Sequence, residues 1–229
     1  MAISGAYDAT GGDEPFPAPL RDAYLAHARL MATRKGQIII AEGSEADDVF
    51  LIRSGRVQVS LMSAHGREVI LRDMGGDRIF GELAAIDRLP RSASVIALED
   101  GQLAHMRGEE FVSFLGNVPQ AGLWMAQQLA ARVRDLTEKT FELATLSVSS
   151  RIHAELLRLA GAGKVDGDVV IVSGFPTHAE LAARVGTHRE AVSRELSQLA
   201  QEGLIRRTGR TLSVLSLAGL QSLHSRLRR

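Results

Sequence analysis

The stretch FGELAAIDRLPRSASV, residues 80–95, decides how the rest of the chain is interpreted. Within it, Gly81 and Glu82 precede a short apolar turn, and Arg91 and Ser92 follow after a loop. An arginine fork binds a phosphate through two parallel hydrogen bonds, a glutamate accepts from a ribose hydroxyl, and amides that open a helical turn add partial positive charge. These residue types predict a site for a small sugar phosphate, with Glu82 as hydroxyl acceptor and Arg91 as anion holder.

The chain has 229 residues and contains no cysteine. This length predicts two domains, each with its own core. The lack of cysteine excludes disulfides, thiolate zinc sites and cysteine-held iron–sulfur clusters. No apolar run approaches the roughly 20 residues that a bilayer requires, and the N-terminus lacks a signal-peptide pattern, so we expect a soluble, cytoplasmic protein without a membrane partner.

The formal net charge is zero, but the charges are unevenly distributed. Residues 1–149 contain 15 Lys and Arg against 20 Asp and Glu, and residues 150–229 contain 12 against 7, so the two parts carry −5 and +5. A basic C-terminal part behind an acidic one is typical of a nucleic-acid-binding module attached to a module of another kind.

Short apolar segments separated by turns dominate the first half of the chain. We interpret residues 1–19 as a disordered tail and residues 20–31 as a short amphipathic helix. From residue 35 to about 111 the segments are β-rich, and glycine-containing turns such as SAHGRE separate them. This pattern predicts an antiparallel barrel or jelly roll over residues 20–116.

Residues 117–147 are predicted to contain one long helix, from about Gln120 to Ser147. Apolar and small residues recur there at alternating steps of three and four, and charged residues flank them. An ordinary helix packed on its own barrel is the alternative, but the narrow stripe favours the seam of a parallel homodimer. The seam consists of Ala126, Leu129, Val133, Leu136, Thr140 and Leu143.

Residues 148–229 carry the signals of a winged helix-turn-helix. Two capping boxes, Thr177-His-Ala-Glu180 and Thr187-His-Arg-Glu190, predict two helices separated by a short turn. Leu181, Ala182 and Val185 are expected to point inward on the first helix, and Val192, Leu196 and Leu199 on the second. A hairpin that turns at Gly209–Arg210 and a last helix from Ser216 to about Leu227 complete the domain.

The outward face of the second predicted helix carries side chains that can contact DNA. Arginine pairs with guanine in the major groove, glutamate accepts from cytosine, and the hairpin arginines can meet phosphates. A charged, solvated helix face is the alternative, but the spacing, the basic charge and the hairpin together favour DNA binding. The candidate DNA-binding residues are Thr187, His188, Arg189, Glu190, Ser193, Arg194, Arg206, Arg207 and Arg210.

The motifs FGELA, PRSA and GTHREAVSRELSQLAQEGLI, in this order, resemble the family of the cyclic-AMP receptor protein and the anaerobic regulator FNR, from about residue 20 onward. The resemblance implies an α+β fold, with a cyclic-nucleotide-binding jelly roll, a long helix that forms a homodimer, and a winged helix-turn-helix that binds a palindromic DNA operator. It also implies a regulator without enzymatic activity, whose operator affinity is allosterically controlled by a cyclic nucleotide and whose further partner is RNA polymerase.

The resemblance assigns roles to individual residues. It places Gly81, Glu82, Leu83 and Ala84 at the start of a phosphate-binding cassette and pairs Arg91 with Ser92 at the cyclic phosphate. It places Arg189, Glu190 and Arg194 at base-reading positions. Ser193 matches the FNR branch instead, so a half-site like TGTGA is expected without its letters being fixed.

This chain departs from its relatives at the base end of the ligand. Members selective for cyclic AMP place two adjacent hydroxyl residues on the dimer helix, whereas the corresponding positions here are Leu136 and Thr137. Leucine offers no hydrogen bond, so base selectivity rests on Thr137, is looser, or favours cyclic GMP. Ser92, where cyclic-GMP binders often carry threonine, favours cyclic AMP.

Three other functions fit the sequence less well. A regulator that acts without a ligand, or with another effector, conflicts with the presence of both Glu82 and Arg91, and a nucleotide-binding subunit that acts on another protein conflicts with the winged helix. A metal-dependent enzyme conflicts with the lack of clustered His and acidic ligands. Haem is not expected either, because His65 lies in a predicted turn and His105 in a predicted strand.

Overall fold

A computed structural model describes residues 14–227 of the protein. The chain divides into two units, and the boundary falls between Arg132 and Val133, inside one long helix. We describe the N-terminal and the C-terminal unit separately.

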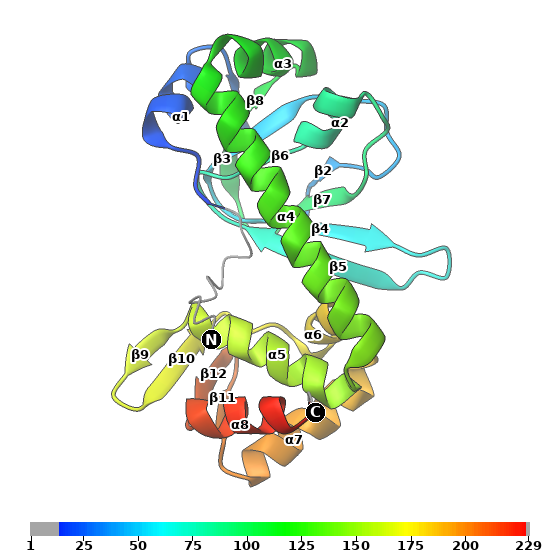
Figure 1. Cartoon of the computed structure of the whole chain (residues 1–229), viewed down its shortest axis with the longest axis vertical. Helices are drawn as coiled ribbons and strands as arrows, with labels where there is room; N and C mark the ends of the chain where they lie inside the picture. Colours follow the sequence, from blue (N-terminus) through cyan, green and yellow to red (C-terminus); the bar gives the residue numbers. More distant parts are fainter. Residues whose placement is uncertain (1–13, 228–229) are drawn as a thin grey trace, which may run out of the picture. The chain divides into compact units, whose positions relative to one another are not determined.

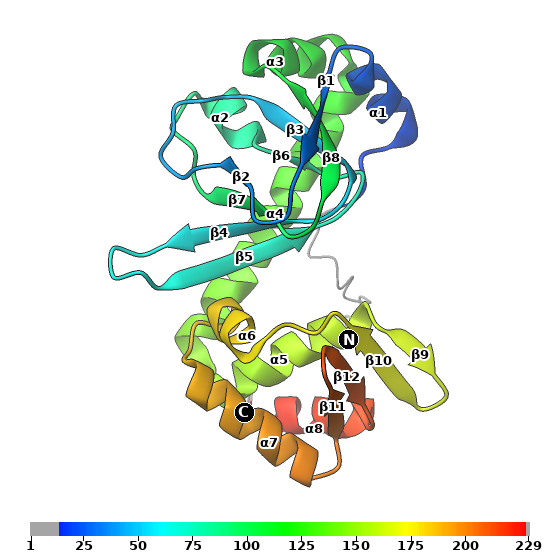
Figure 2. The same ribbon diagram turned by 180° about the vertical axis from the view of Figure 1, so that it is seen from behind.

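The N-terminal unit is built on two four-stranded sheets whose strand pairs are all antiparallel (Figures 1 and 2). This confirms the expected β-rich jelly roll. The first sheet has the order β1 (Arg29–Thr33), β8 (Gly101–Met106), β3 (Val49–Ser54) and β6 (Ile79–Phe80). The second has the order β2 (Ile38–Ile40), β7 (Ser94–Ala97), β4 (Val57–Met62) and β5 (Glu68–Met74).

Apolar side chains from both sheets share one core. Phe50 and Phe80 stack with ring centroids 5.1 Å apart, and Ile52 and Leu103 are almost fully buried. Burial of this apolar area is the main contribution to the stability of the jelly roll. The core fixes β6 and β7, the two strands that enclose residues 80–95.

Three helices close one end of the barrel around a second, aromatic core. They are α1 (Ala18–Leu25), α3 (Gly108–Asn117) and the first turns of α4 (Pro119–Thr145). Phe16 is 2% exposed and packs against Tyr24, Phe114 and Trp124. The tail predicted for residues 1–19 is therefore too long, because Phe16 belongs to the core and the chain is helical from Ala18. Residues 1–13 lie outside the described residues.

The expected helix over residues 20–31 is also too long. Helix α1 ends at Leu25, and residues 29–33 form β1. Met31 continues the three-and-four spacing of the apolar residues before it, but β1 pairs with β8 over five residues, and the sheet satisfies its backbone hydrogen bonds. Helix α3 was not expected from the sequence.

Helix α4 spans 27 residues, close to the predicted range. Its seam residues are largely solvent-exposed in the single chain: Val133 is 64% exposed, and Leu136 and Leu143 are each 54% exposed. Leu129 instead packs partly against the aromatic core of the barrel. An exposed apolar row of this kind is unusual on a monomer surface.

The C-terminal unit is a winged helix-turn-helix, as predicted. Val192, Leu196 and Leu199 of α7 (Arg189–Gln201) pack in one core with Leu181 and other inward residues of α6 (His178–Val185). A four-stranded antiparallel sheet with the order β11-β12-β10-β9 completes the unit. Its elements are α5 (Val148–Gly161), β9 (Lys164–Asp166), β10 (Val169–Ser173), α6 (His178–Val185), α7 (Arg189–Gln201), β11 (Ile205–Thr208), β12 (Thr211–Val214) and α8 (Leu217–Leu227).

Of the two predicted capping boxes, only the one at the start of α6 forms. Thr177 caps α6 and Glu180 reaches back to the Thr177 amide, as expected. The second box does not form, because His188 is the N-cap of α7 and no side chain caps that helix. The Thr187 amide instead donates to the carbonyl of Ala182 and belongs to the turn.

Candidate functional site

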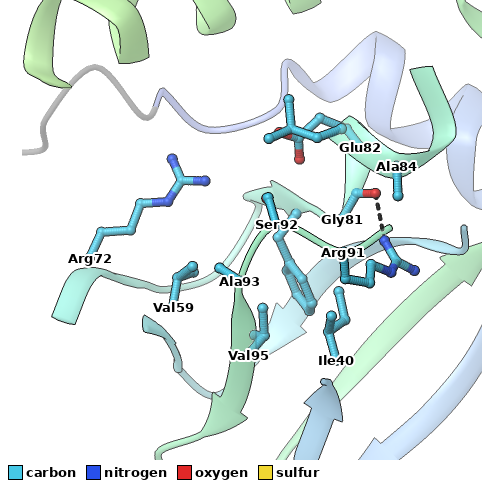
Figure 3. A pocket seen from close by; sticks show the side chains of 12 residues that line it. Ile40, Val59, Arg72, Gly81, Glu82, Ala84, Arg91, Ser92, Ala93 and Val95 are labelled. Atoms are coloured by element: carbon cyan, nitrogen blue, oxygen red, sulfur yellow. Dashed lines mark hydrogen bonds between the residues drawn. The ribbon is translucent and has the colours of Figure 1, made fainter. Parts of the chain in front are cut away.

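A pocket in the N-terminal unit is formed by α2 (Glu82–Asp87), the loop that follows it and strands of the second sheet (Figure 3). It encloses about 390 Å³ of space, part of which is open to solvent. The pocket brings together all six residues that the sequence places there in this unit, Gly81, Glu82, Leu83, Ala84, Arg91 and Ser92; Ile40, Val59, Arg72, Phe80, Ala93 and Val95 complete it.

Gly81 begins the pocket segment with a backbone that requires glycine. Its φ is 86°, in the left-handed region, and it precedes α2 directly. A Cβ at this position would lie 2.8 Å from the carbonyl oxygen of Asp48 and 2.9 Å from Nη1 of Arg91. Glycine thus permits the close approach that places α2 beside Arg91.

Glu82 is the buried carboxylate of the pocket, only 2% exposed. Its Oε1 accepts a hydrogen bond from Arg132 of α4, and its Oε2 has no hydrogen-bond partner among the described residues. A buried carboxylate oxygen without a partner is costly. A hydroxyl group that entered the pocket would relieve that cost by donating to Oε2.

Arg91 is 5% exposed, and its guanidinium is held by backbone carbonyls. Nη1 donates to Gly81 O and Nη2 donates to Asp48 O, each at 2.7 Å (Figure 3 shows the first bond). Burial lowers the pKa of Arg91, although Asp48, Asp47 and Glu82 act in the opposite direction. Two of its five N–H groups are occupied, and the buried Nε–H has no partner among residues 14–227, so the side chain keeps donors for an anion.

Two arginines of this site were not identified from the sequence. Arg72 extends from β5 over the pocket, on the side away from Arg91 (Figure 3). Arg132 holds Glu82 from α4. The sequence marks Arg132 only as a charged flank of the predicted seam, and Arg72 follows a strand pattern without any motif.

Leu136 and Thr137, the expected base-end residues, lie on the part of α4 that belongs to the C-terminal unit. Both are solvent-exposed, and the Thr137 hydroxyl donates to the carbonyl of Val133 in its own helix. The two residues and the pocket therefore belong to different units.

The two histidines of the barrel lie apart from the pocket lining. His65 is exposed in the turn between β4 and β5, while His105 of β8 is near Asp48, with 3.4 Å between Nδ1 and Oδ1, and stacks on Phe50. Within residues 14–227, no three His, Cys, Asp or Glu side chains are grouped so that they could hold a metal ion. The described helices include none that is long and apolar enough to cross a membrane.

The C-terminal unit presents a basic surface on α7 and on the wing, which is the hairpin of β11 and β12. The candidate residues with exposed side chains are His188, Arg189, Glu190, Arg194, Arg206, Arg207 and Arg210, whereas Thr187 and Ser193 are half-buried. Val192 and Leu196 face the core, so the first turns of α7 turn their charged side toward solvent. Ser193 Oγ lies 2.7 Å from Nδ1 of His178, a residue that sequence analysis did not single out.

Comparisons with known proteins agree with this arrangement. The family model of the cyclic nucleotide-binding domain matches residues 31–117, and that of the Crp-like helix-turn-helix domain matches residues 150–223. The CRP-like cAMP-activated global transcriptional regulator of Mycobacterium tuberculosis is 30% identical over 79% of this chain and 81% of its own. The cyclic AMP receptor protein of Thermus thermophilus is 30% identical over 88% of this chain and 91% of its own.

Solved structures share the fold. The c-di-GMP responsive global regulator CLP of Xanthomonas campestris covers 86% of this chain and 99% of its own, with a TM-score of 0.77 at 24% identity. A mutant of CooA from Carboxydothermus hydrogenoformans covers 98% of this chain and 97% of its own, with a TM-score of 0.76 at 22% identity.

The fold and the matched domains define a regulator in which a cyclic nucleotide-binding domain is joined to a helix-turn-helix domain. The chain belongs to the family of the cyclic-AMP receptor protein and FNR, whose members are DNA-binding transcription regulators and not enzymes.

Proposed function

We propose that this protein is a homodimeric transcription regulator whose affinity for a palindromic DNA operator is controlled by a cyclic nucleotide bound at Glu82 and Arg91. The observation that carries the proposal is the pairing of two buried groups in one pocket: a carboxylate oxygen without a partner among residues 14–227 and a guanidinium that keeps unused N–H donors. A ribose hydroxyl and a cyclic phosphate on one small molecule supply the complementary groups.

The exposed row on α4 supports the homodimer. Val133, Leu136 and Leu143 recur at steps of three and seven, and a second copy that packs on them buries all three. A dimer also matches the two half-sites of a palindromic operator. A transcription regulator that binds an operator acts where the DNA is transcribed. We therefore also propose a cytoplasmic location and RNA polymerase as a further partner.

Of the two cyclic nucleotides, we favour cyclic AMP over cyclic GMP as the ligand. Both relatives with 30% identity are named for cyclic AMP, and Ser92 lines the pocket where cyclic-GMP binders often carry threonine. Arg72 is a further determinant, because its side chain lies over the pocket away from Arg91, where the base of a bound nucleotide would extend.

The second candidate function is regulation by another effector or by none. It is favoured by the hydrogen bonds that Arg91 already makes to two carbonyls and by the absence of a hydroxyl at Leu136. Isothermal titration calorimetry of the full chain with cyclic AMP and cyclic GMP separates the two. A binding heat that saturates at one site per chain in wild type and disappears in Arg91→Ala supports control by a cyclic nucleotide. No binding heat with either nucleotide supports regulation by another effector or by none.

A further inference from the structure

His178, the first residue of α6, connects α7 to the wing. Its side chain is half-buried and contacts two other elements of the C-terminal unit. Nδ1 lies 2.7 Å from Oγ of Ser193 on α7, and Nε2 is hydrogen-bonded to Nη1 of Arg207 on β11. One imidazole ring thus lies between the two surfaces that DNA would meet.

The partners of His178 determine which ring nitrogen carries the proton. A guanidinium only donates hydrogen bonds, so Nε2 must accept from Arg207 and carries no proton. In the neutral imidazole the proton is then on Nδ1, which donates to the oxygen of Ser193. Burial, Arg207 and Arg189 all lower the pKa of His178, in keeping with a neutral ring.

Ser193 is left with a defined hydrogen-bonding role. Its oxygen accepts from His178, so its own O–H points away from the imidazole ring. Among the described residues no acceptor for this O–H is found. The hydroxyl of the half-buried Ser193 is therefore available to donate to a group outside the protein.

Arg207 is fixed by three contacts. Its Cζ lies 5.8 Å from the centroid of the buried Phe175 ring, its Nε donates to Gly209 O at 3.1 Å in the wing turn, and its Nη1 donates to His178. A guanidinium stacked on an aromatic face loses little further freedom when it meets an anion. The wing turn and α7 therefore share His178 as their common support.

We propose that His178 is a positioning residue for DNA recognition: it fixes Ser193 as a hydrogen-bond donor toward DNA and holds Arg207 of the wing in place. The inference rests on the proposed DNA-binding function and deepens it. The matching group on DNA is a hydrogen-bond acceptor, which is either a base edge in the major groove or a phosphate oxygen.

The proton position is tested without DNA. A long-range nitrogen–proton NMR spectrum of the full chain, with His178→Gln for assignment, should show His178 as the tautomer protonated on Nδ1 at pH 7.5. A ring protonated on Nε2, or a fast mixture of both forms, would overturn the proposal regardless of what the protein does with DNA.

The DNA experiment begins with selection of duplexes from a randomised library by the wild-type full chain with cyclic AMP or cyclic GMP. Affinity for the selected duplex is then measured for Ser193→Ala, His178→Ala, His178→Gln, the double variant His178→Ala with Ser193→Ala, and a matched control, His65→Ala in the barrel hairpin. Glutamine accepts through Oε1 and donates through Nε2, so it can replace both contacts of the neutral imidazole.

The expected result is a loss of about three- to tenfold for His178→Ala and for Ser193→Ala, with no further loss in the double variant. His178→Gln and His65→Ala should stay close to wild type. If the acceptor is a base, His178→Ala and Ser193→Ala relax preference at the same half-site position. If it is a phosphate oxygen, both weaken every duplex alike.

Two results contradict the proposal: losses that add in the double variant, or a glutamine variant as weak as the alanine variant. A wild-type chain that selects no sequence would refute the proposed DNA-binding function itself. The NMR result still reports on the histidine contact in that case, so the two failures are distinguishable.

Discussion

Arg132 of α4 donates a hydrogen bond to Oε1 of Glu82, the carboxylate that is 2% exposed at the start of α2. The pair joins the long helix directly to the pocket. Because Oε2 of the same carboxylate has no partner among the described residues, a ligand hydroxyl that binds there would contact a group already held by α4. We therefore expect the Glu82–Arg132 pair to link the proposed nucleotide to α4, so that binding favours one arrangement of the helix over another.

Arg132→Ala should destabilise the N-terminal unit by about 3 kcal/mol, because it leaves the Glu82 carboxylate buried without its cation. Urea unfolding followed by Trp124 fluorescence measures the effect. Arg134→Ala, on an exposed position of the same helix, is the control and should change stability by about 0.5 kcal/mol or less. Equal effects of the two substitutions would show that the Glu82–Arg132 pair contributes nothing.

Arg158→Ala should destabilise the C-terminal unit by about 3–5 kcal/mol. Arg158 of α5 donates to both oxygens of Glu142 at 2.9 and 3.2 Å and to Glu155 at 2.9 Å, and both carboxylates are buried. The substitution leaves two buried carboxylates without their main partner and loosens the last turns of α4 from α5. Chemical denaturation measures it, with the exposed Lys164→Ala as control, and a change below about 1 kcal/mol would contradict the role.

Arg194→Ala should weaken binding to the cognate DNA site by about 1–3 kcal/mol and relax sequence preference at one position. The Arg194 side chain is exposed on α7, on the side away from the buried Val192 and Leu196. Fluorescence anisotropy with matched and single-substituted duplexes measures both effects. A variant with unchanged preference would show that Arg194 does not read a base.

The stability of the C-terminal unit should fall as the pH drops below about 6.5, through His178. The pKa of this histidine in the folded protein is lowered from its ordinary value of 6.5 by burial and by Arg207 and Arg189. The unfolded chain therefore binds a proton in a range where the folded chain does not, so protonation favours unfolding.

The test compares wild type with His178→Gln in urea unfolding at pH 7.5 and pH 5.5. Glutamine does not titrate, so any advantage of wild type over the variant should shrink at the lower pH. An advantage that stays constant or grows at pH 5.5 would show that the pKa is not lowered in the folded state.

The winged helix could be predicted from sequence because its signals are local. The Thr177 cap, the inward Leu181 and Val185 and the hairpin turn at Gly209 all lie within a few residues of the structure they specify. The start of α7 was misplaced by one residue because Thr187 and His188 are both able to begin a helix, and the turn backbone decides between them.

The barrel was less predictable because tertiary pairing outweighs local pattern. The helical spacing of the apolar residues continues to Met31, yet the backbone of residues 29–33 pairs with β8, more than 60 residues later along the chain. Arg91 lines the pocket as its motif suggests, but its hydrogen bond to the carbonyl of Asp48 spans 43 residues and has no local signal in the sequence. Arg72 and Arg132 were missed for the same reason, since each reaches the pocket from a distant element.

The central claim is that a cyclic nucleotide in the pocket controls DNA affinity. It is tested most directly by measuring the DNA affinity of the full chain in parallel titrations with cyclic AMP and cyclic GMP, for wild type and Arg91→Ala. Arg88→Ala, on the exposed end of α2, is the control. Sedimentation shows whether each variant is still a dimer. We predict that cyclic AMP raises the DNA affinity of wild type and of the control and leaves Arg91→Ala unchanged and dimeric. Equal DNA affinity with and without either nucleotide, or stimulation that survives in Arg91→Ala, would contradict the account.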